Sequence, residues 1–297
     1  MTQVQFHKNS KHISRYPDII PNITKLSHSS KLQMHQIELT KGNFLFIHPV
    51  KDPEFYEFLY IVEGKLGVGD QIYDKYDYYI VDKSQEEVII DILEDTILLS
   101  SIPSGKKAYD TNRFKELAEI MEAIQEKDHY TLNHCKRVKS ISKLIADELK
   151  LHPKDKMNLL KAAFFHDVGK IMVEDQILNK VGKYTPDEYL LMKKHVTFSS
   201  EILGSKYPGL VHEIVLEHHE RLDGSGYPNG IKDISLLGRI LAIADTFDAM
   251  TTDRVYKKGK TFSVAIEELK SLSDQYDLDI IMLLEKIIQE KSELLMK

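Results

Sequence analysis

The sequence of 297 residues contains a single cysteine, Cys135, so no disulfide can form within the chain. Glycine (14 residues) and proline (9 residues) are scarce, which excludes a collagen-like or low-complexity chain. No run of about 18 uncharged apolar residues occurs, so no helix is expected to cross a membrane. The first residues, MTQVQFHKNSKH, lack the apolar segment of a signal peptide. These absences predict a cytoplasmic protein without membrane insertion.

Basic residues are not in excess either. Lys and Arg number 40 against 46 Asp and Glu, which gives a formal net charge of −6. This balance argues against a nucleic-acid polymer or an anionic membrane as the partner, although a local basic pocket for a small anion stays compatible with it. Hydrophobic residues (42%) and charged residues (29%) are in the range of soluble globular proteins, and the length predicts two domains.

The two parts of the chain differ in their apolar pattern. Short apolar runs separated by turn residues predict strands at Phe44–Ile47, Phe58–Val62, Tyr78–Val81, Val88–Ile90 and Ile97–Leu99. Such spacing is typical of a small barrel or sandwich. After Gly105, apolar residues recur three or four apart, which predicts helices. We therefore predict a β domain over residues 1–105, a connecting helix over 106–126 and an all-α domain over 127–297.

Ionisable residues lie on the apolar faces of four predicted helices, over residues 130–150, 157–170, 211–220 and 236–250. The residues in register with these faces are His134, His166, Asp167, His218, His219, Asp245 and Asp248. One buried histidine is usually a satisfied core residue. Burying several imidazoles and carboxylates together is costly unless they are paired or bind metal. Histidine nitrogens and aspartate oxygens suit first-row transition metals, and an aspartate can bridge two of them.

Four local motifs resemble those of the HD-GYP phosphodiesterases, a subgroup of the HD phosphohydrolase superfamily. Residues 166–170 (HDVGK) resemble its HDxGK core, and residues 218–228 (HHERLDGSGYP) match the element that defines the subgroup. Residues 128–134 (DHYTLNH) and 244–254 (ADTFDAMTTDR) resemble its opening and closing segments. The order and spacing agree over residues 111–297. The resemblance implies an all-α domain that hydrolyses cyclic di-GMP to linear pGpG, or onward to GMP.

The resemblance also implies a centre of two divalent transition metals, iron or manganese. By position, one metal would be held by His134, His166, Asp167 and Asp245. Asp167 would bridge to a second metal, held by His195, His218 and His219. Without the family pattern, His195 would count as a surface histidine. Metal-bound water would become hydroxide near neutral pH and attack the phosphorus, which makes Asp167 and Lys170 the candidate catalytic residues.

Basic and aromatic residues near these motifs are candidate substrate contacts. Lys170 lies one turn after His166 and can reach a phosphate oxygen. Arg254 can form bidentate pairs with phosphate or guanine, and Lys257 is a candidate for the same role. A solvated surface position is the alternative for the three cations. Tyr227 is expected at the rim of the substrate pocket.

The loop around Tyr227 is predicted from its composition. Gly224 and Gly226 permit unusual dihedral angles, and Pro228 fixes φ. Asp223 is expected to orient a ligand histidine or the loop itself, and Asp248 is expected to support the site from behind.

Two positions depart from the family pattern. Some members carry a glutamate four residues before the first histidine, which helps to bind a third metal; here the residue is Tyr130. We therefore expect two metals and a reaction that stops at pGpG. Cys135 follows the first histidine, where serine is common, and we expect a buried, inert thiol rather than an oxidation sensor.

The N-terminal part resembles a cupin more weakly. Residues Glu57–Gly64 resemble a cupin strand pair, which implies a cupin-like β-barrel over residues 30–102. The His-x-His metal motif that precedes this glutamate in cupins is missing, since the aligned stretch is Val50-Lys51-Asp52. We expect no metal in the barrel. Its expected role is regulatory, as the site of an unidentified small ligand or of homodimer contacts; a purely structural barrel is the alternative.

Three functions remain open on the sequence. The leading one is a cyclic di-GMP phosphodiesterase. The second is a phosphodiesterase for another cyclic dinucleotide, such as cyclic GMP-AMP, or for another phosphoester. The third is a cyclic-dinucleotide receptor or interaction module with little turnover. The intact ligand set favours an enzyme.

Overall fold

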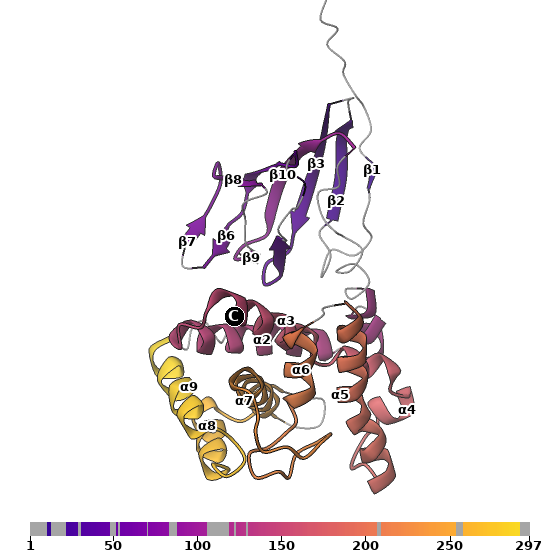
Figure 1. The fold of residues 1–297 in the computed structure, drawn as a ribbon, viewed down its shortest axis with the longest axis vertical. Helices are drawn as coiled ribbons and strands as arrows, with labels where there is room; N and C mark the ends of the chain where they lie inside the picture. The colour runs from indigo at the N-terminus through magenta and orange to yellow at the C-terminus, as the bar shows by residue number, and fades with distance from the viewer. Residues whose placement is uncertain are drawn as a thin grey trace, which may run out of the picture. The chain divides into compact units, whose positions relative to one another are not determined.

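The computed structural model describes residues 11–12, 22–28, 31–47, 52, 54–69, 71–82, 88–105, 119–121, 123–128, 130–206, 209–253 and 258–291. The chain divides into two compact units, residues 1–118 and 119–297 (Figure 1). The first unit is rich in strands and the second is helical, as predicted. The predicted boundaries at residues 105 and 126 stay predictions, because residues 106–118 lie outside the described ranges.

The N-terminal unit contains two sheets among its described residues. Its strands are β1 (Lys11–His12), β2 (Asn22–His28), β3 (Leu32–Leu39), β4 (Phe44–Ile47), β5 (Glu57–Glu63), β6 (Leu66–Val68), β7 (Gln71–Tyr73), β8 (Tyr78–Val81), β9 (Val88–Ile92) and β10 (Thr96–Pro103). The order is β1-β2-β3-β10-β5-β8 in the larger sheet and β4-β9-β6-β7 in the smaller one. All pairings are antiparallel.

One hydrophobic core joins the two sheets. Leu59 and Leu98 of the larger sheet belong to the same buried cluster as Leu66 and Ile90 of the smaller one. Alternate residues of β10 are buried, as expected for a strand with one face on a core. Among the described strands no pairing joins the two sheets, so the predicted barrel is not closed and the alternative, a sandwich, fits better.

The sequence pattern missed five strands, β1, β2, β3, β6 and β7, of which β1 has only two residues. β2 and β3 lie in a stretch that reads as polar, because among the side chains of β3 only Ile37 and Leu39 are buried. β6 and β7 have three residues each and flank the turn at Gly69, so their apolar runs are too short to recognise.

The helical unit contains the candidate site. Its described elements are α2 (Thr131–Glu148), α3 (Pro153–Phe165), the 3-10 helix η1 (Val168–Met172), α4 (Asp175–Leu178), α5 (Pro186–Lys206), α6 (Leu210–Glu217), α7 (Leu236–Thr251), α8 (Phe262–Ser271) and α9 (Leu278–Lys291). α7 contacts α2, α3, α6, α8 and α9 and lies at the centre of the unit (Figure 1). Among the described residues, no helix is both long and apolar enough to span a bilayer.

Two of the four predicted helices were too long. α3 ends at Phe165 and α6 ends at Glu217, whereas the pattern continued to Lys170 and Glu220. His166 and Asp167 therefore lie in a turn before η1, and His218 and His219 lie in a turn after α6. Apolar periodicity continues through these turns because His166, Asp167 and His218 are as buried as core residues.

Candidate metal centre

Three of the candidate histidines are oriented by the backbone of their own helix. The Nδ1–H groups of His166, His195 and His218 each donate to the carbonyl oxygen three residues earlier, at Ala163, Met192 and Val215. This fixes the tautomer and leaves Nε2 as the free acceptor. All three Nε2 atoms are buried and have no hydrogen-bond partner within the described residues. Buried acceptors of this kind are costly unless something binds them.

The fourth histidine is oriented by a distant side chain. His134 Nδ1 lies 2.7 Å from Asp248 Oδ2, 114 residues away on α7. Arg137 holds the same carboxylate with two donors, Nε to Oδ1 at 2.6 Å and Nη2 to Oδ2 at 3.0 Å. The Tyr130 hydroxyl donates to Oδ2 at 3.4 Å. Asp248 therefore supports the site from behind, by presenting His134 with Nε2 directed inward.

The inward-facing donor atoms gather into two groups. The first group is His134, His166 and Asp245, and the second group is His195, His218 and His219. Within each group the ligand atoms lie within 4.8 Å of one another, close enough to share one ion. His134 Nε2 lies 3.0 Å from Asp245 Oδ1.

Asp167 lies between the two groups. Its Oδ1 is 3.4 Å from His195 Nε2, in the second group, and its Oδ2 is 3.4 Å from His166 Nε2, in the first. Asp245 also reaches across, since its Oδ2 is 4.0 Å from His219 Nδ1. Each oxygen of Asp167 faces a different group, which is the arrangement that a bridging carboxylate requires.

A close contact between η1 and α5 sets this geometry. A Cβ atom on Gly169 would lie 2.2 Å from the His195 carbonyl oxygen, so no side chain fits there. The Gly169 N–H donates to Ser199 Oγ at 2.7 Å. The glycine of the HDVGK motif therefore lets α5 approach closely enough to place His195 against Asp167.

The electrostatics of the two groups differ. Burial lowers the pKa of His195, and burial together with His166 lowers the pKa of His218 to about 3. Burial and the neighbouring His218 also lower the pKa of His219. Burial opposes protonation of His134 too, but its hydrogen bonds to Asp245 and Asp248 outweigh it and raise the pKa to about 9. The second group is thus neutral near pH 7.

Cation neighbours keep the carboxylates ionised. Burial alone would raise the pKa of Asp167, yet Lys170 and His166 hold that pKa well below its usual range. Lys170 Nζ lies 2.8 Å from Asp167 Oδ2, and this ion pair raises the pKa of the lysine against the effect of burial. The hydrogen bond and charge of His134 likewise hold the pKa of Asp245 low despite burial. Anionic carboxylates and neutral imidazoles are the forms that bind metal.

A third combination of donors includes Cys135 with His166 and Asp167. Burial raises the pKa of the Cys135 thiol well above its usual value, and His166 uses Nδ1, the atom nearest the sulfur, for its bond to Ala163. A protonated thiol is a poor ligand. The expected buried thiol is confirmed, since Cys135 is 0% exposed.

The loop that contains Gly226-Tyr227-Pro228, called the GYP loop below, packs on the second donor group. The Tyr227 ring stacks on His219 with centroids 4.8 Å apart, and the Tyr227 N–H donates to the His219 carbonyl. Gly226 has no room for a side chain, because a Cβ would lie 2.4 Å from Glu220 Cα. Asp223 is exposed and accepts the Ser225 N–H at 2.8 Å, so it shapes the loop and touches no ligand histidine. Gly224 has a φ of 83° and Pro228 is exposed.

Some site residues were not identified from the sequence. Arg137, at position i+3 from His134 on the same helix, braces Asp248. Glu220 is 1% exposed, and its Oε1 accepts the N–H groups of Asn229 and Gly230, which holds the loop. A charged residue inside the motif of residues 218–228 was a signal for Glu220, and a basic residue one turn after His134 was a signal for Arg137. Two predicted contacts, Arg254 and Lys257, lie outside the described residues.

The donor set fits two divalent transition metals. Two groups of three donors face a shared carboxylate, and several of their lone pairs have no protein partner. Imidazole and carboxylate together suit manganese, iron or zinc. The geometry therefore supports a two-metal site, which is a common arrangement for displacement at phosphorus.

Comparisons with known proteins agree with this geometry. The sequence model of the family described as "HD domain" matches residues 119–280, more than half of the chain. A "Cyclic di-GMP phosphodiesterase" of Thermotoga maritima is 42% identical over 164 residues, which covers 53% of this chain and 45% of that protein. A "3'3'-cGAMP-specific phosphodiesterase 3" of Vibrio cholerae is 36% identical over 146 residues, or 48% of this chain and 32% of that protein. The chain thus spans less than half the length of these relatives.

One solved structure that the chain resembles is a distant cupin. An RmlC-like cupin from Shewanella frigidimarina covers 36% of this chain and 95% of its own, with 13% identity and a TM-score of 0.28. A likeness at this level carries no argument about the fold. The cupin resemblance therefore stays a prediction.

Proposed function

The chain belongs to the HD domain family, and from that premise we propose that it is a metal-dependent phosphodiesterase that hydrolyses cyclic di-GMP. The observation that carries the proposal is the position of Asp167, with one carboxylate oxygen facing each donor group. The names of the relatives, which act on cyclic dinucleotides, support the substrate class.

The candidate ligands divide between two metals. His134, His166 and Asp245 would hold one ion, His195, His218 and His219 would hold the other, and Asp167 would be shared. We propose iron or manganese, because both accept mixed imidazole and carboxylate ligands. When bound, such a pair supplies a hydroxide near neutral pH and a clamp for the phosphoryl oxygens.

The protein's own groups would orient the reaction. Asp248 and Arg137 fix the ring of His134, while backbone carbonyls fix the rings of His166, His195 and His218. Lys170 places a half-buried positive charge beside Asp167, where the phosphate would bind, and so would offset charge that develops on the phosphoryl oxygens. We propose that Arg254 and Lys257 contact phosphate or guanine.

We propose linear pGpG as the end product. Tyr130 occupies the position where some family members have a glutamate for a third metal. Its ring stacks on His134 with centroids 5.4 Å apart, and its hydroxyl donates to Asp248. A phenol in this position offers no anionic oxygen, which supports a two-metal site.

The second candidate substrate is 3'3'-cyclic GMP-AMP. The relative from Vibrio cholerae named for this substrate is 36% identical, close to the 42% of the cyclic di-GMP relative. The two dinucleotides share their phosphodiester chemistry and differ in one base, so the metal centre described above serves either.

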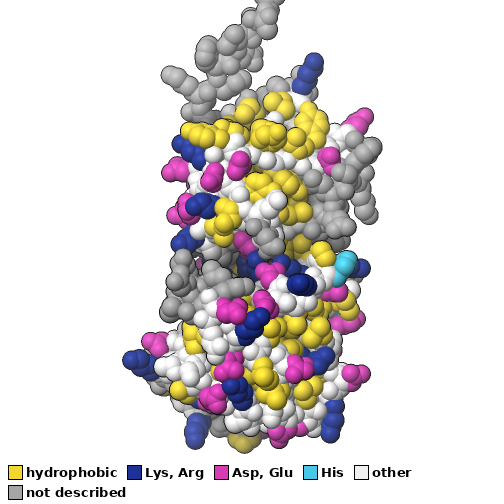
Figure 2. All heavy atoms as spheres, turned by 90° about the vertical axis from the view of Figure 1, so that its left-hand side faces the viewer, with side chains coloured by type: hydrophobic (Ala, Val, Ile, Leu, Met, Phe, Trp, Pro, Cys, Tyr) yellow, Lys and Arg dark blue, Asp and Glu magenta, His cyan; other side chains and the backbone are white. Residues whose placement is uncertain are grey.

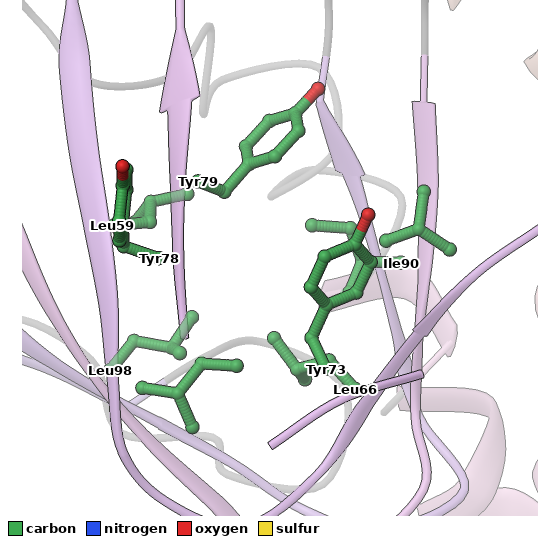
Figure 3. A pocket seen from close by; sticks show the side chains of 9 residues that line it. Leu59, Leu66, Tyr73, Tyr78, Tyr79, Ile90 and Leu98 are labelled. Atoms are coloured by element: carbon green, nitrogen blue, oxygen red, sulfur yellow. The ribbon is translucent and has the colours of Figure 1, made fainter. Parts of the chain in front are cut away.

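We propose a regulatory role for the N-terminal unit through an apolar hollow between its two sheets, open in part to solvent. It is lined by Leu59, Ile61, Leu66, Val68, Tyr73, Tyr78, Tyr79, Ile90 and Leu98 from both sheets (Figure 3). The lining is apolar apart from the tyrosine hydroxyls, so a small apolar molecule is the fitting ligand. Native mass spectrometry of the purified full chain would detect such a ligand, and its absence under gentle conditions would count against this role.

We also propose a homodimer and a cytoplasmic location. The side of the N-terminal unit that carries β6, β7 and β8 shows hydrophobic side chains in Figure 2. Phe58 (37% exposed), Tyr78 (60%) and Ile80 (47%) lie on β5 and the edge strand β8. Exposed apolar patches of this kind often mark interfaces. An Ile80→Lys variant that sediments as a monomer, beside a dimeric parent chain, would support the interface; a monomeric parent chain would exclude it.

A product assay tests the proposed activity. The full chain is purified anaerobically, loaded with iron(II) or manganese(II), and given cyclic di-GMP or 3'3'-cyclic GMP-AMP, and products are resolved by chromatography. Accumulation of pGpG is expected. Conversion to GMP would contradict the two-metal proposal. Binding without turnover, together with a biological output that survives Asp167→Ala, would favour a receptor instead.

A further inference from the structure

A cluster of one lysine and two tyrosines lies beside the second donor group. Tyr189 and Lys193 are one turn apart on α5, and the GYP loop brings Tyr227 to them. Lys193 Nζ lies 4.5 Å from the centroid of the Tyr189 ring and 4.7 Å from that of Tyr227. Tyr227 in turn stacks on His219. The ammonium group is therefore separated from a candidate metal ligand by one aromatic ring.

The other described cations around the site have polar partners. Lys170 is paired with Asp167, and Arg137 forms two hydrogen bonds with Asp248. Arg221 donates to the carbonyl oxygens of Glu220 and His218. Within the described part of the chain, no carboxylate lies within ion-pair distance of the Lys193 ammonium, which is held by the faces of two rings.

This arrangement leaves a positive charge available to a ligand. Two ring faces fix the position of the ammonium without neutralising it, and an ammonium group has three N–H donors. Lys193 is only partly buried and Tyr189 is 47% exposed, so the cluster is open to solvent on one side. A fixed, unneutralised cation at the edge of a phosphodiesterase site is complementary to a phosphate.

A cyclic dinucleotide carries two phosphodiester groups. The metal centre would bind the phosphodiester that is cleaved. The second phosphodiester also carries a negative charge, and a cation that pairs with it has to lie within the length of the dinucleotide from the metal centre. We propose that Lys193, positioned by Tyr189 and Tyr227, binds the phosphate that is not cleaved. This subsite rests on the proposed function, since it supposes a substrate with two phosphates.

The competing interpretation is mechanical. Lys193 could serve only to hold the GYP loop against α5 through its contacts with the two tyrosine rings. Loss of its charge would then displace Tyr227 and, through it, His219. The two interpretations differ in their dependence on substrate. A phosphate subsite affects substrates with two phosphates, whereas a mechanical role affects every substrate of the metal centre.

The test compares substrates with two phosphates and with one. Full-length Lys193→Met keeps most of the side-chain length and loses the charge. Hydrolysis of cyclic di-GMP and of bis(4-nitrophenyl) phosphate, which has a single phosphate, is measured with manganese(II)-loaded protein, and metal content and thermal stability are recorded. Lys194→Met, an exposed lysine next in the chain, is the matched control. Lys193→Arg tests rescue by a retained charge.

We expect Lys193→Met to raise the KM for cyclic di-GMP by about tenfold or more, with little change in kcat, because a charge-assisted contact made throughout the reaction is lost. The loss in kcat/KM should exceed that for the single-phosphate diester by about the same factor. Lys193→Arg should recover most of the loss, and Lys194→Met should resemble the parent chain. Equal losses on both substrates, or no loss on either, would overturn the proposal.

Failure of the proposed function would be visible separately. If the parent chain cleaves bis(4-nitrophenyl) phosphate and neither cyclic dinucleotide, the proposed activity is wrong. The subsite is then judged by inhibition of that single-phosphate reaction by pGpG. Weaker inhibition of Lys193→Met than of the parent chain would support the subsite, and equal inhibition would overturn it.

Discussion

The two donor groups of the metal centre are built in different ways. In the second group, His195 and His218 are oriented by carbonyl oxygens of their own helices, and burial keeps the group neutral. In the first group, His134 depends on Asp248 from α7 and on the arginine that braces it. Local carbonyl oxygens thus orient His195 and His218 in the second group and His166 in the first, while His134 of the first group depends on side-chain contacts with a segment far away in the chain. We expect the two groups to respond differently to mutation and to pH.

The largest effect is expected where the groups share a ligand. Asp167→Ala should lower kcat by about 10³-fold or more, because both ions lose a carboxylate and the charge partner of Lys170 is removed. Metal content, measured by mass spectrometry, should fall at both sites. Asp187→Ala, on an exposed residue in the first turn of α5, is the control. Retention of both metals would show that Asp167 is not shared.

A change confined to the second group should separate the two sites. His218→Ala removes one of three clustered imidazoles, so we expect bound metal to fall from two ions per chain to one and kcat to fall by about 10²-fold or more. His212→Ala, on the helix that ends just before His218, is the matched control. Loss of both ions together would mean that the groups bind metal as one unit.

A smaller effect is expected from the support of the first group. Asp248→Asn keeps the shape of the side chain but weakens its hold on His134, so metal affinity at the first group should fall by about 10- to 100-fold. Arg137→Ala should act in the same direction and more weakly, because Asp248 keeps its bond to His134. Titration of the metal-free protein with manganese(II) measures both. An equal loss of metal affinity at the second group would show that the two groups do not bind metal independently.

The smallest effect concerns the stability of the metal-free protein. His218 has a folded pKa of about 3, below its ordinary value of 6.5. Its contribution to the free energy of unfolding is therefore present above pH 6.5 and is lost as the pH falls toward 3. His134 has a raised pKa of about 9, so its contribution is present below pH 6.5 and is lost as the pH rises through 9.

Urea unfolding of chelator-treated protein across this pH range would measure how stability falls at acid pH (the acid limb) and at alkaline pH (the alkaline limb). We expect His218→Gln to reduce the loss of stability at acid pH, because it removes the titrating imidazole, and Asp248→Asn to reduce the loss at alkaline pH, because it removes one of the hydrogen bonds that raise the pKa of His134. A variant that changes the free energy of unfolding equally at acid and at alkaline pH would show that the histidines titrate as a single coupled set.

Local sequence features predicted much of this molecule. The five strands with clear apolar runs are present, because each run is long enough to bury one face against the core. The candidate ligands other than His195 were found because histidine and aspartate on apolar helix faces are costly without a partner, and His195 was added by the family resemblance alone. β2 and β3 were missed because the described side chains of both strands are mostly only half-buried, and the ends of α3 and α6 were misplaced because buried polar residues continue the apolar period.

The sequence by itself determined the class of the helical unit and most of its candidate donor residues, since those depend on residue type and on spacing along a helix; His195 followed only from the family resemblance. Only the tertiary structure decided how the donors combine. The placement of His195 against Asp167 depends on the contact of α5 with Gly169, and the orientation of His134 depends on a carboxylate 114 residues away. The aromatic cradle of Lys193 requires α5 and the GYP loop to meet. Spacing along a chain carries no information about such contacts, because they are fixed by the packing of whole helices against one another.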